Sequence, residues 1–429
     1  MAVIVGFDYL TKDAEFNFKD YQPEISRIHK MIEEKTGEGA EYLGWLHFPS
    51  NHDEAEVDRM IAKANQLRKD YETLVVCGIG GSYLGPRASI EILNGLFPTD
   101  KMEIVYLGNT LDPNYMYEAI EHLKKKKFCV CCISKSGTTT ETSISFRILK
   151  ELAEEKYGKE GARDAIVAIT DKEKGALRTL SDNEGYTTFI LPGDIGGRFS
   201  VMTSVGLFPM AVAGIDIKAF IEGLKEGEVN YGVEDVMHNA SYQYALERHL
   251  LYKHGYSLEL VASYEPRLAL LIGWMQQLFD ESEGKNGKSL YMAGATFTTD
   301  LHSLGQFIQD GSKIMFETVL FVVEPQNDVT IPYDEDNLDQ LNYIADRKLS
   351  YVNAKAHDGT LAAHAYEGNV PNITIQVHKM DAKQLGEIYY FFMKACAMSA
   401  YLNGVNPFNQ PGVEIYKKNM FHLLGKKGY

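Results

Sequence analysis

The chain has 429 residues, which is too long for a single ordinary hydrophobic core, so we expect two domains. Hydrophobic residues make up 45% and charged residues 24%, the mix typical of a globular protein. The 43 basic and 59 acidic side chains leave a net charge of −16, which argues against nucleic acid and anionic membranes as partners but allows a small anionic ligand in a locally basic pocket.

The chain opens with MAVIVGFDYLTKDAEF, which has no basic stretch before its short apolar run, so we expect no signal peptide. No apolar run approaches the roughly 20 residues that span a bilayer, and we expect a cytoplasmic protein. Apolar side chains recur every three or four residues over 21–34 and 54–70, which predicts two helices. We interpret residues 1–69 as a helical segment that packs on the core.

From about residue 70, short apolar runs alternate with helical patterns. The runs are TLVVC, EIVYL, FCVCCI, AIVAIT and TTFIL. Apolar runs without polar alternation are typical of strands covered on both faces, and helices between them indicate parallel pairing through right-handed crossovers. The sequence predicts an open parallel α/β domain over residues 70–215.

The same pattern returns after a helical connection at residues 216–239. The runs LELVAS, LYMAGATF, ETVLFVV and NITIQV alternate with helices, and a long helix follows at 383–402. This predicts a second parallel α/β domain over 240–405 and a C-terminal helix within 406–429. Because ligands bind beyond the carboxyl ends of strands in such sheets, the loops after the strands are the candidates for function.

The first candidate loop is CGIGGSYLGP, residues 77–86. Its glycines allow a tight turn and a close approach to a ligand, but Tyr83 stands where a dinucleotide fingerprint needs its third glycine, and no Walker lysine follows. A nicotinamide dehydrogenase is therefore disfavoured. A ligand-binding loop and a plain strand-to-helix turn both remain possible.

The second candidate loop is SKSGTTTET, residues 134–142, which follows a strand and opens a helix. Helix N-termini favour anions, and hydroxyl, glycine and lysine residues suit a phosphate. We predict a monophosphate cradle; the alternative is a helix cap with more hydroxyls than it needs. The cradle residues are Ser134, Lys135, Ser136, Gly137, Thr138 and Thr139.

Four further residues are candidates for chemistry. Arg198, after two glycines, is suited to stabilising an oxyanion or to a surface ion pair. The helix ending in DESEG carries Glu281 between other acids, and an acidic helix end is usually solvated surface. His302 follows a strand and a Ser/Thr-rich turn, and Lys417 lies in NQPGVEIYKK; a lone histidine or lysine is normally structural.

Metal-binding patterns do not occur in the sequence. It has no HExxH, EF-hand or zinc-finger spacing, and we expect no metal and no cofactor. The five cysteines, three of them in FCVCCI, are interpreted as buried thiols in a reducing compartment. The run KKKK at 124–127 is interpreted as a solvated helix end.

Together these segments resemble the glucose-6-phosphate isomerase (phosphoglucose isomerase) family, in its shorter bacterial form, from about residue 70 to the C-terminus. The resemblance implies an α/β protein of two open parallel-sheet sugar-isomerase (SIS) domains with flanking helices. It also implies a homodimer, no cofactor, and the reversible conversion of glucose 6-phosphate into fructose 6-phosphate in glycolysis and gluconeogenesis.

The resemblance carries residue roles. GIGGS matches the family's first loop and places Gly81 and Ser82 beside the sugar, and SKSGTT resembles its phosphate loop. GGRFS matches a family signature and makes Arg198 the group that stabilises an enediolate. QQLFDES makes Glu281 the catalytic base and Gln277 a substrate contact.

The remaining roles concern ring opening and the C-terminus. LHS aligns with a family G-Q-H stretch, although Asp300 and Leu301 replace its glycine and glutamine, and implies that His302 opens the ring from the neighbouring subunit. NQPGVEIYK matches the C-terminal signature and implies roles for Gln410 and Lys417. Another SIS-type phosphosugar isomerase and a non-catalytic sugar-phosphate-binding protein are the alternatives.

Overall fold

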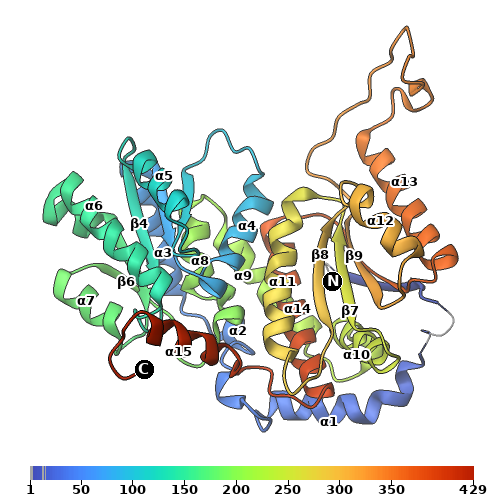
Figure 1. Cartoon of the computed structure of the whole chain (residues 1–429), viewed down its shortest axis with the longest axis horizontal. Helices are drawn as coiled ribbons and strands as arrows, with labels where there is room; N and C mark the ends of the chain where they lie inside the picture. Colours follow the sequence, from blue (N-terminus) through green and yellow to red (C-terminus); the bar gives the residue numbers. More distant parts are fainter. Residues whose placement is uncertain (1–2, 12–13, 15) are drawn as a thin grey trace.

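The computed structural model describes residues 3–11, 14 and 16–429. Two five-stranded sheets form two lobes that lie side by side (Figure 1). The first sheet has the order β3-β2-β4-β5-β6, and its strands are all parallel. Its strands are β2 (Thr73–Cys77), β3 (Glu103–Leu107), β4 (Phe128–Ile133), β5 (Ile166–Thr170) and β6 (Thr187–Ile190). The five predicted strands of this region are confirmed.

Burial explains why these strands lack polar alternation. Every residue of β2, β4 and β5 is buried, because helices cover both faces of the sheet. The connecting helices are α4 (Leu84–Asn94), α5 (Pro113–Leu123), α6 (Thr140–Ala165) and α7 (Ala176–Glu184). All five cysteines are buried and unpaired, as predicted.

The second sheet has the order β1-β10-β9-β7-β8. Its predicted strands are β7 (Leu258–Ser263), β8 (Tyr291–Thr296), β9 (Met315–Val322) and β10 (Asn372–Val377), and these are parallel to one another. Helices of this lobe include α11 (Ala269–Glu283), α12 (Leu301–Asp310) and α13 (Leu349–Ala362). The parallel strands of the two sheets, with helices between them, confirm the predicted α/β class.

The beginning of the chain differs from the prediction. The helices α1 (Gln22–Glu33) and α3 (Glu54–Asp70) form where expected, but β1 (Val3–Tyr9) joins the second sheet antiparallel to β10. A purely helical segment over 1–69 was therefore wrong for the described residues before α1. The strand was missed because its hydrogen-bond partner lies far along the chain, with Val3 opposite Val377.

The helix α14 (Ala382–Leu402) lies between the lobes, and residues 385–401 are buried without interruption. A helix that is covered all round belongs to a core rather than to a surface. It packs on α9 (Ile217–Asn230), α10 (Ala240–Lys253) and α11, and one hydrophobic cluster runs through both lobes. The lobes therefore share a core, and α11 packs against α4 of the first lobe. The other α-helices are α2 (Phe48–Asn51), α8 (Ser204–Val212) and α15 (Val413–Leu423).

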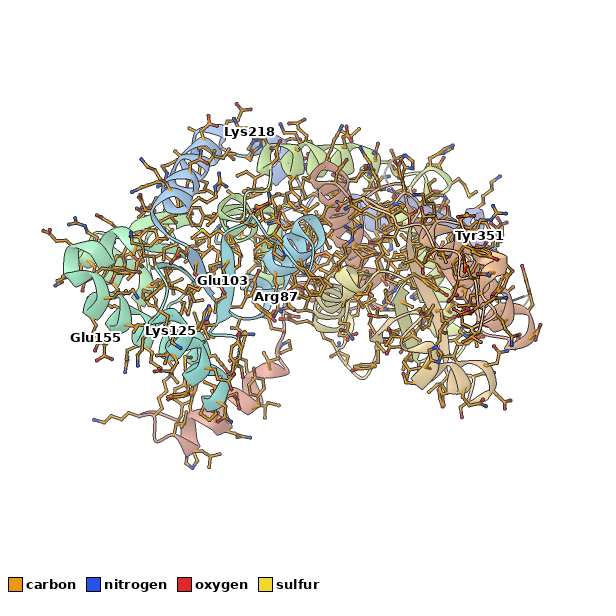
Figure 2. All side chains as sticks on the ribbon, turned by 90° about the horizontal axis from the view of Figure 1, so that it is seen from above. Arg87, Glu103, Lys125, Glu155, Lys218 and Tyr351 are labelled. Carbon is orange, nitrogen blue, oxygen red and sulfur yellow. The ribbon has the colours of Figure 1, made fainter. Side chains whose placement is uncertain are left out.

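The surface has two notable features, a long extension and a lysine run. Between β9 and α13, residues 323–348 extend far from the second lobe and form what we call the arm, orange in Figure 1. Figure 2 shows Lys125, from the KKKK run, in the first lobe and Tyr351 at the opposite end of the molecule. Lys125 is exposed, as the interpretation of a solvated helix end requires. Across the residues that the structure describes, no helix combines the length and apolarity needed to cross a bilayer.

Candidate active site

A cavity of about 590 Å³ lies at the carboxyl ends of β2 and β4. Its walls are the loops after β2, β4 and β6, the end of α11, residues 408–411 and Tyr42. A second cavity of about 480 Å³ shares Gln277 and Glu281 with the first and is lined on its other side by α15. The polar loops predicted from the sequence therefore meet the helix α11 at one place.

Most of the predicted site residues line these two cavities. Those in the first are Gly81, Ser82, Ser134, Lys135, Thr139, Arg198, Gln277, Glu281 and Gln410. Ser136, Thr138 and Lys417 line the second cavity. Gly137 and His302 line neither.

The glycines of the loop after β2 bring two backbones into contact. A Cβ atom on Gly81 would lie 1.9 Å from the carbonyl oxygen of Gly197, so a larger residue does not fit. Gly80 has a φ of +59°, in the left-handed region that favours glycine. This close approach puts Ser82 and Arg198 on the same cavity, which a plain strand-to-helix turn does not require.

The loop after β4 is ordered by its own hydroxyl groups. The Ser134 hydroxyl accepts a hydrogen bond from Gly137 N at 3.0 Å, and the hydroxyls of Ser136 and Thr138 are 2.9 Å apart. The helix α6 begins at Thr140, and the side chain of its N-cap, Thr139, makes no capping hydrogen bond. An N-terminus without a side-chain cap leaves N–H groups for an anion, so the geometry suits a phosphate.

Gly137 has a structural task in this loop. Its φ is +70°, and a Cβ atom there would lie 2.2 Å from the backbone nitrogen of Leu177. Any side chain would therefore push the loop away from α7. Across the loop, Lys135 donates a hydrogen bond to the carbonyl oxygen of Gly193 at 2.6 Å, which ties the loop after β4 to the loop after β6.

Arg198 is almost fully buried, with 2% of its surface exposed. Its guanidinium donates to Ser282 Oγ at 2.7 Å, to Gln410 Oε1 at 3.2 Å, and to the carbonyl oxygens of Pro407 at 2.6 Å and Asn409 at 3.3 Å. Burial lowers the pKa of this guanidinium from its ordinary value. A fixed, desolvated cation of this kind is suited to stabilising negative charge that develops on a bound molecule.

The acidic end of α11 resolves a choice that the sequence left open. Asp280 accepts a hydrogen bond from Met292 N at 3.0 Å, and burial raises the pKa of Asp280 to about 7. Glu283 is buried and accepts from Arg248 Nη1 at 2.8 Å. Of these three acids, only Glu281 lines the cavities.

The carboxylate of Glu281 is held at both oxygens. Its Oε1 lies 3.2 Å from Arg198 Nη1, and its Oε2 accepts a hydrogen bond from Gln277 Nε2 at 3.0 Å. The other atom of the Gln277 amide, Oε1, is buried and has no hydrogen-bond partner among the described residues. The hydrogen bond to Glu281 thus fixes the amide of Gln277, a residue that also lines the cavity.

Lys417 lies on α15, a helix with no buried residue. Its ammonium is 2.9 Å from Glu414 Oε1, and the hydrogen bond to this carboxylate raises the pKa of Lys417 from its ordinary value. Lys417 faces the second cavity, which is continuous with the lining around Glu281.

His302 lies on α12 of the second lobe, where its side chain is exposed. Within one chain, the structure therefore does not bring His302 together with the other predicted site residues. The resemblance implied a role in the neighbouring subunit, and an exposed position is what such a role requires.

Sequence reasoning missed Tyr42 and Asn409 as parts of the cavity wall. Tyr42 reaches the cavity because the next residue, Leu43, pairs with Ile195, and Gly44 N donates to Asp194 O at 3.1 Å. No local pattern in the sequence announces this contact, since the two segments are separated by the whole first sheet. Asn409 lies next to the predicted Gln410, so it could have been found from its position.

Known proteins are similar to this chain over most of its length. The family model described as "Phosphoglucose isomerase" matches residues 62–427. The glucose-6-phosphate isomerase of Staphylococcus saprophyticus is 51% identical over 407 residues, which cover 94% of this chain and 92% of that protein.

Solved structures share the fold over nearly the whole chain. A hypothetical protein of Thermus thermophilus is 26% identical with a TM-score of 0.88, and the match covers 98% of this chain and 99% of that one. The glucose-6-phosphate isomerase of Chlamydia trachomatis has a TM-score of 0.81 at 20% identity, over 99% of this chain and 88% of that one, which supports the fold alone.

Proposed function

The chain belongs to the phosphoglucose isomerase family, and we propose that it interconverts glucose 6-phosphate and fructose 6-phosphate, in glycolysis and gluconeogenesis. The observation that carries this proposal is the meeting of an anion-binding loop, a cavity-facing carboxylate and a buried arginine at one cavity. A phosphosugar needs the first, and an aldose–ketose isomerisation needs the other two.

The phosphate group of the substrate would bind at the loop after β4, formed by residues 134–139. Its hydroxyls and the N-terminus of α6 supply donors, and Lys135 supplies charge. The phosphate does not react. Its binding energy holds C1 and C2 of the sugar against Glu281, which converts an encounter into an oriented step.

Glu281 would act as the base that moves the proton between C2 and C1. It removes the proton from C2 of the open-chain aldose, and the C1 carbonyl oxygen takes up the negative charge of a cis-enediolate. A proton then passes from O2 to O1, the C2–O2 bond becomes the carbonyl of the ketose, and the carboxyl group returns its proton to C1. Arg198, 3.2 Å from Glu281, would stabilise the negative charge of the enediolate. Gln277, which lines the same cavity, would contact the sugar.

Ring opening needs an acid for the ring oxygen and a base for the anomeric hydroxyl. We assign this pair to Lys417 and to His302 of a second copy of the chain. Two observations favour a homodimer with a shared site. His302 is exposed outside the cavities of its own chain, and the arm presents large apolar side chains to solvent, with Leu338 87% and Tyr343 79% exposed.

The proposal needs no metal and no cofactor. A phosphosugar isomerase of this kind would act in the cytoplasm, with its thiols reduced. A non-catalytic sugar-phosphate-binding protein would also use the loop after β4, but it has no need of a carboxylate held beside a buried arginine. Another phosphosugar isomerase would share the mechanism and differ in its sugar.

The decisive experiment follows glucose 6-phosphate carrying deuterium at C2, with all metal chelated. We expect fructose 6-phosphate to form and deuterium to pass to solvent. Turnover that requires a divalent cation would contradict the mechanism, and binding without turnover would favour the non-catalytic alternative. Amino-sugar phosphates assayed in parallel test the substrate.

Sharing of the site has its own test. Glu281→Gln and His302→Asn chains, each nearly inactive alone, are unfolded together and refolded as a mixture. Hybrid dimers contain one site with both native residues, so part of the activity returns. A mixture no more active than its components would argue against a shared site.

A further inference from the structure

Lys285 follows the end of α11 and binds two segments at once. Its ammonium donates to the carbonyl oxygen of Ser282 at 2.7 Å and to the carbonyl oxygen of Asn406. Ser282 belongs to the last turn of α11, directly after Glu281, and Asn406 belongs to the segment that leads to Gln410. Lys285 is thus a direct link between the catalytic helix end and the C-terminal segment.

The segment 406–410 is held by two cations. Lys285 donates a hydrogen bond to the carbonyl oxygen of Asn406, and Arg198 donates to the carbonyl oxygens of Pro407 and Asn409. In Figure 1 the chain after α14 crosses from the second lobe toward the first, where α15 lies. The two cations hold the chain by hydrogen bonds at this crossing, just before Gln410.

The hydrogen bonds to this segment also orient the guanidinium of Arg198. Its Nη1 atom is 3.2 Å from both Gln410 Oε1 and Glu281 Oε1, while its Nη2 atom is bound to the segment. If the segment moved, the guanidinium would lose its contacts with Pro407, Asn409 and Gln410. A cation that stabilises an oxyanion must be oriented before the charge develops.

The surroundings of Lys285 lower its pKa toward neutral pH, so its charge can change within the range where the enzyme would be assayed. Burial, followed by the nearby charge of Arg198, lowers the pKa of Lys285 to about 8. The groups that face it with the opposite effect are Cys396, on α14, and Glu281 and Glu283, on α11. Lys285 therefore loses its charge at a pH where an ordinary lysine keeps it.

We propose that Lys285 is a positioning residue for the isomerisation proposed above: it fixes the segment 406–410 against the end of α11 and so holds Arg198 and Gln410 in place for the reacting sugar. The inference rests on the proposed function for its kinetic consequences. The structural part, an ordered segment that depends on Lys285, stands without substrate.

The test compares three variants. Lys285→Met removes the donor, and Lys285→Arg keeps a charge that does not titrate in this range. Lys288→Met is the matched control, because Lys288 also binds a backbone carbonyl, that of Asn403 at 3.1 Å, but lies one step further from the site.

We expect Lys285→Met to lower kcat about 10- to 100-fold with KM within about threefold, because the lost orientation matters most for the charge that develops in the transition state. The wild type should lose activity as the pH rises through about 8, the pKa of Lys285. Lys285→Arg should keep most of kcat and carry this loss to higher pH. Lys288→Met should keep both kcat and the pH profile of the wild type.

A Lys285→Met enzyme with wild-type kcat, or an equal loss in Lys288→Met, would overturn the proposal, since the second result would mark a general structural effect. If Lys285→Met does not fold, the pH profile of Lys285→Arg decides. Amide hydrogen exchange gives a readout without substrate: Lys285→Met should speed exchange over residues 406–410 about tenfold more than Lys288→Met does. Unchanged exchange there would contradict the inference, whereas a wild type without turnover would contradict the proposed function instead.

Discussion

The carboxyl edges of the two sheets have the same layout and different chemistry. Position by position, β3-β2-β4-β5 of the first sheet corresponds to β8-β7-β9-β10 of the second, and only the fifth strands differ, since β6 is parallel and β1 antiparallel to its neighbour. The loops after β2 and β4 carry GIGGS and SKSGTT, rich in glycine and hydroxyl groups. At the corresponding places the second sheet carries YEPRL after β7, and EPQND, which opens the arm, after β9.

The second edge is also hollow, with a cavity of about 580 Å³ lined by Glu265 and Arg267. There, however, the arginine is already paired: Arg267 donates to Glu265 at 2.6 Å and to Gln326 at 2.8 Å. Among the described residues, no glycine lines this cavity. The shared strand order produces a hollow at each edge, and the residue types of the loops decide which hollow can hold a phosphosugar.

The largest expected effect separates the two carboxylates. Glu281→Gln removes the proposed base and should lower kcat about 10²–10⁴-fold, the usual contribution of general acid–base catalysis. Glu265→Gln, at the second edge, should leave kcat within about threefold. The measurement is turnover together with exchange of the C2 proton in the folded variants. If the Glu281→Gln variant still exchanged the C2 proton with solvent, Glu281 would not be the base.

The next effect separates the two arginines. Arg198→Met should lower kcat about 10²–10³-fold, because it deletes a desolvated cation from the site. Arg267→Met should change kcat less than about threefold, since its charge serves Glu265 and Gln326. Kinetic constants of both variants decide the matter, and similar losses in the two would mean that the second edge also serves the reaction.

A smaller effect concerns glycine in the loop after β4. Gly137→Ala forces a Cβ atom against Leu177 at a positive φ, which should cost about 1–3 kcal/mol of stability and raise KM through the displaced phosphate loop. Gly359→Ala, on α13 of the second lobe, has nothing within 4 Å of the added Cβ atom and should be neutral or slightly stabilising. Thermal melting and KM of both variants provide the check; an unstrained Gly137→Ala with unchanged KM would contradict the structural role given to this glycine.

The last prediction concerns stability and not activity, and it involves a buried carboxyl group in the second lobe, that of Glu247. Glu247 on α10 is fully buried, neither carboxylate oxygen has a hydrogen-bond partner among the described residues, and burial raises the pKa of Glu247 to about 8. The folded state thus holds a proton that the unfolded chain releases near pH 4.5. The contribution of this carboxyl group to the free energy of unfolding is fully present below pH 4.5 and is lost as the pH rises through about 8.

Glu247→Gln stays neutral throughout, so its advantage over the wild type should be close to zero at pH 4 and reach about 1–3 kcal/mol near pH 8. Denaturant unfolding at both pH values measures it, with catalytic activity as an unchanged control. An advantage of equal size at the two pH values would show that ionisation of Glu247 is not the cause.

Much of the first lobe followed from local pattern. The runs from TLVVC to TTFIL are apolar on both faces and became the five strands of a parallel sheet, because only buried strands tolerate such composition. The phosphate loop was recognisable for a similarly local reason, since hydroxyls, a glycine and a helix start are consecutive in the chain. By contrast, β1 was missed, because a strand of seven residues needs a partner that lies beyond residue 370.

The sequence by itself determined the two sheets, the loops at their edges and a short set of polar candidates, since each depends on neighbours along the chain. Only the tertiary structure decided which acid of DESE faces the cavity. Asp280 is turned to Met292, Glu283 to Arg248 and Glu281 to Arg198, three partners from three different parts of the molecule. Which partner each carboxylate meets depends on how α11 is packed between the lobes, and that packing comes from residues distant in the chain.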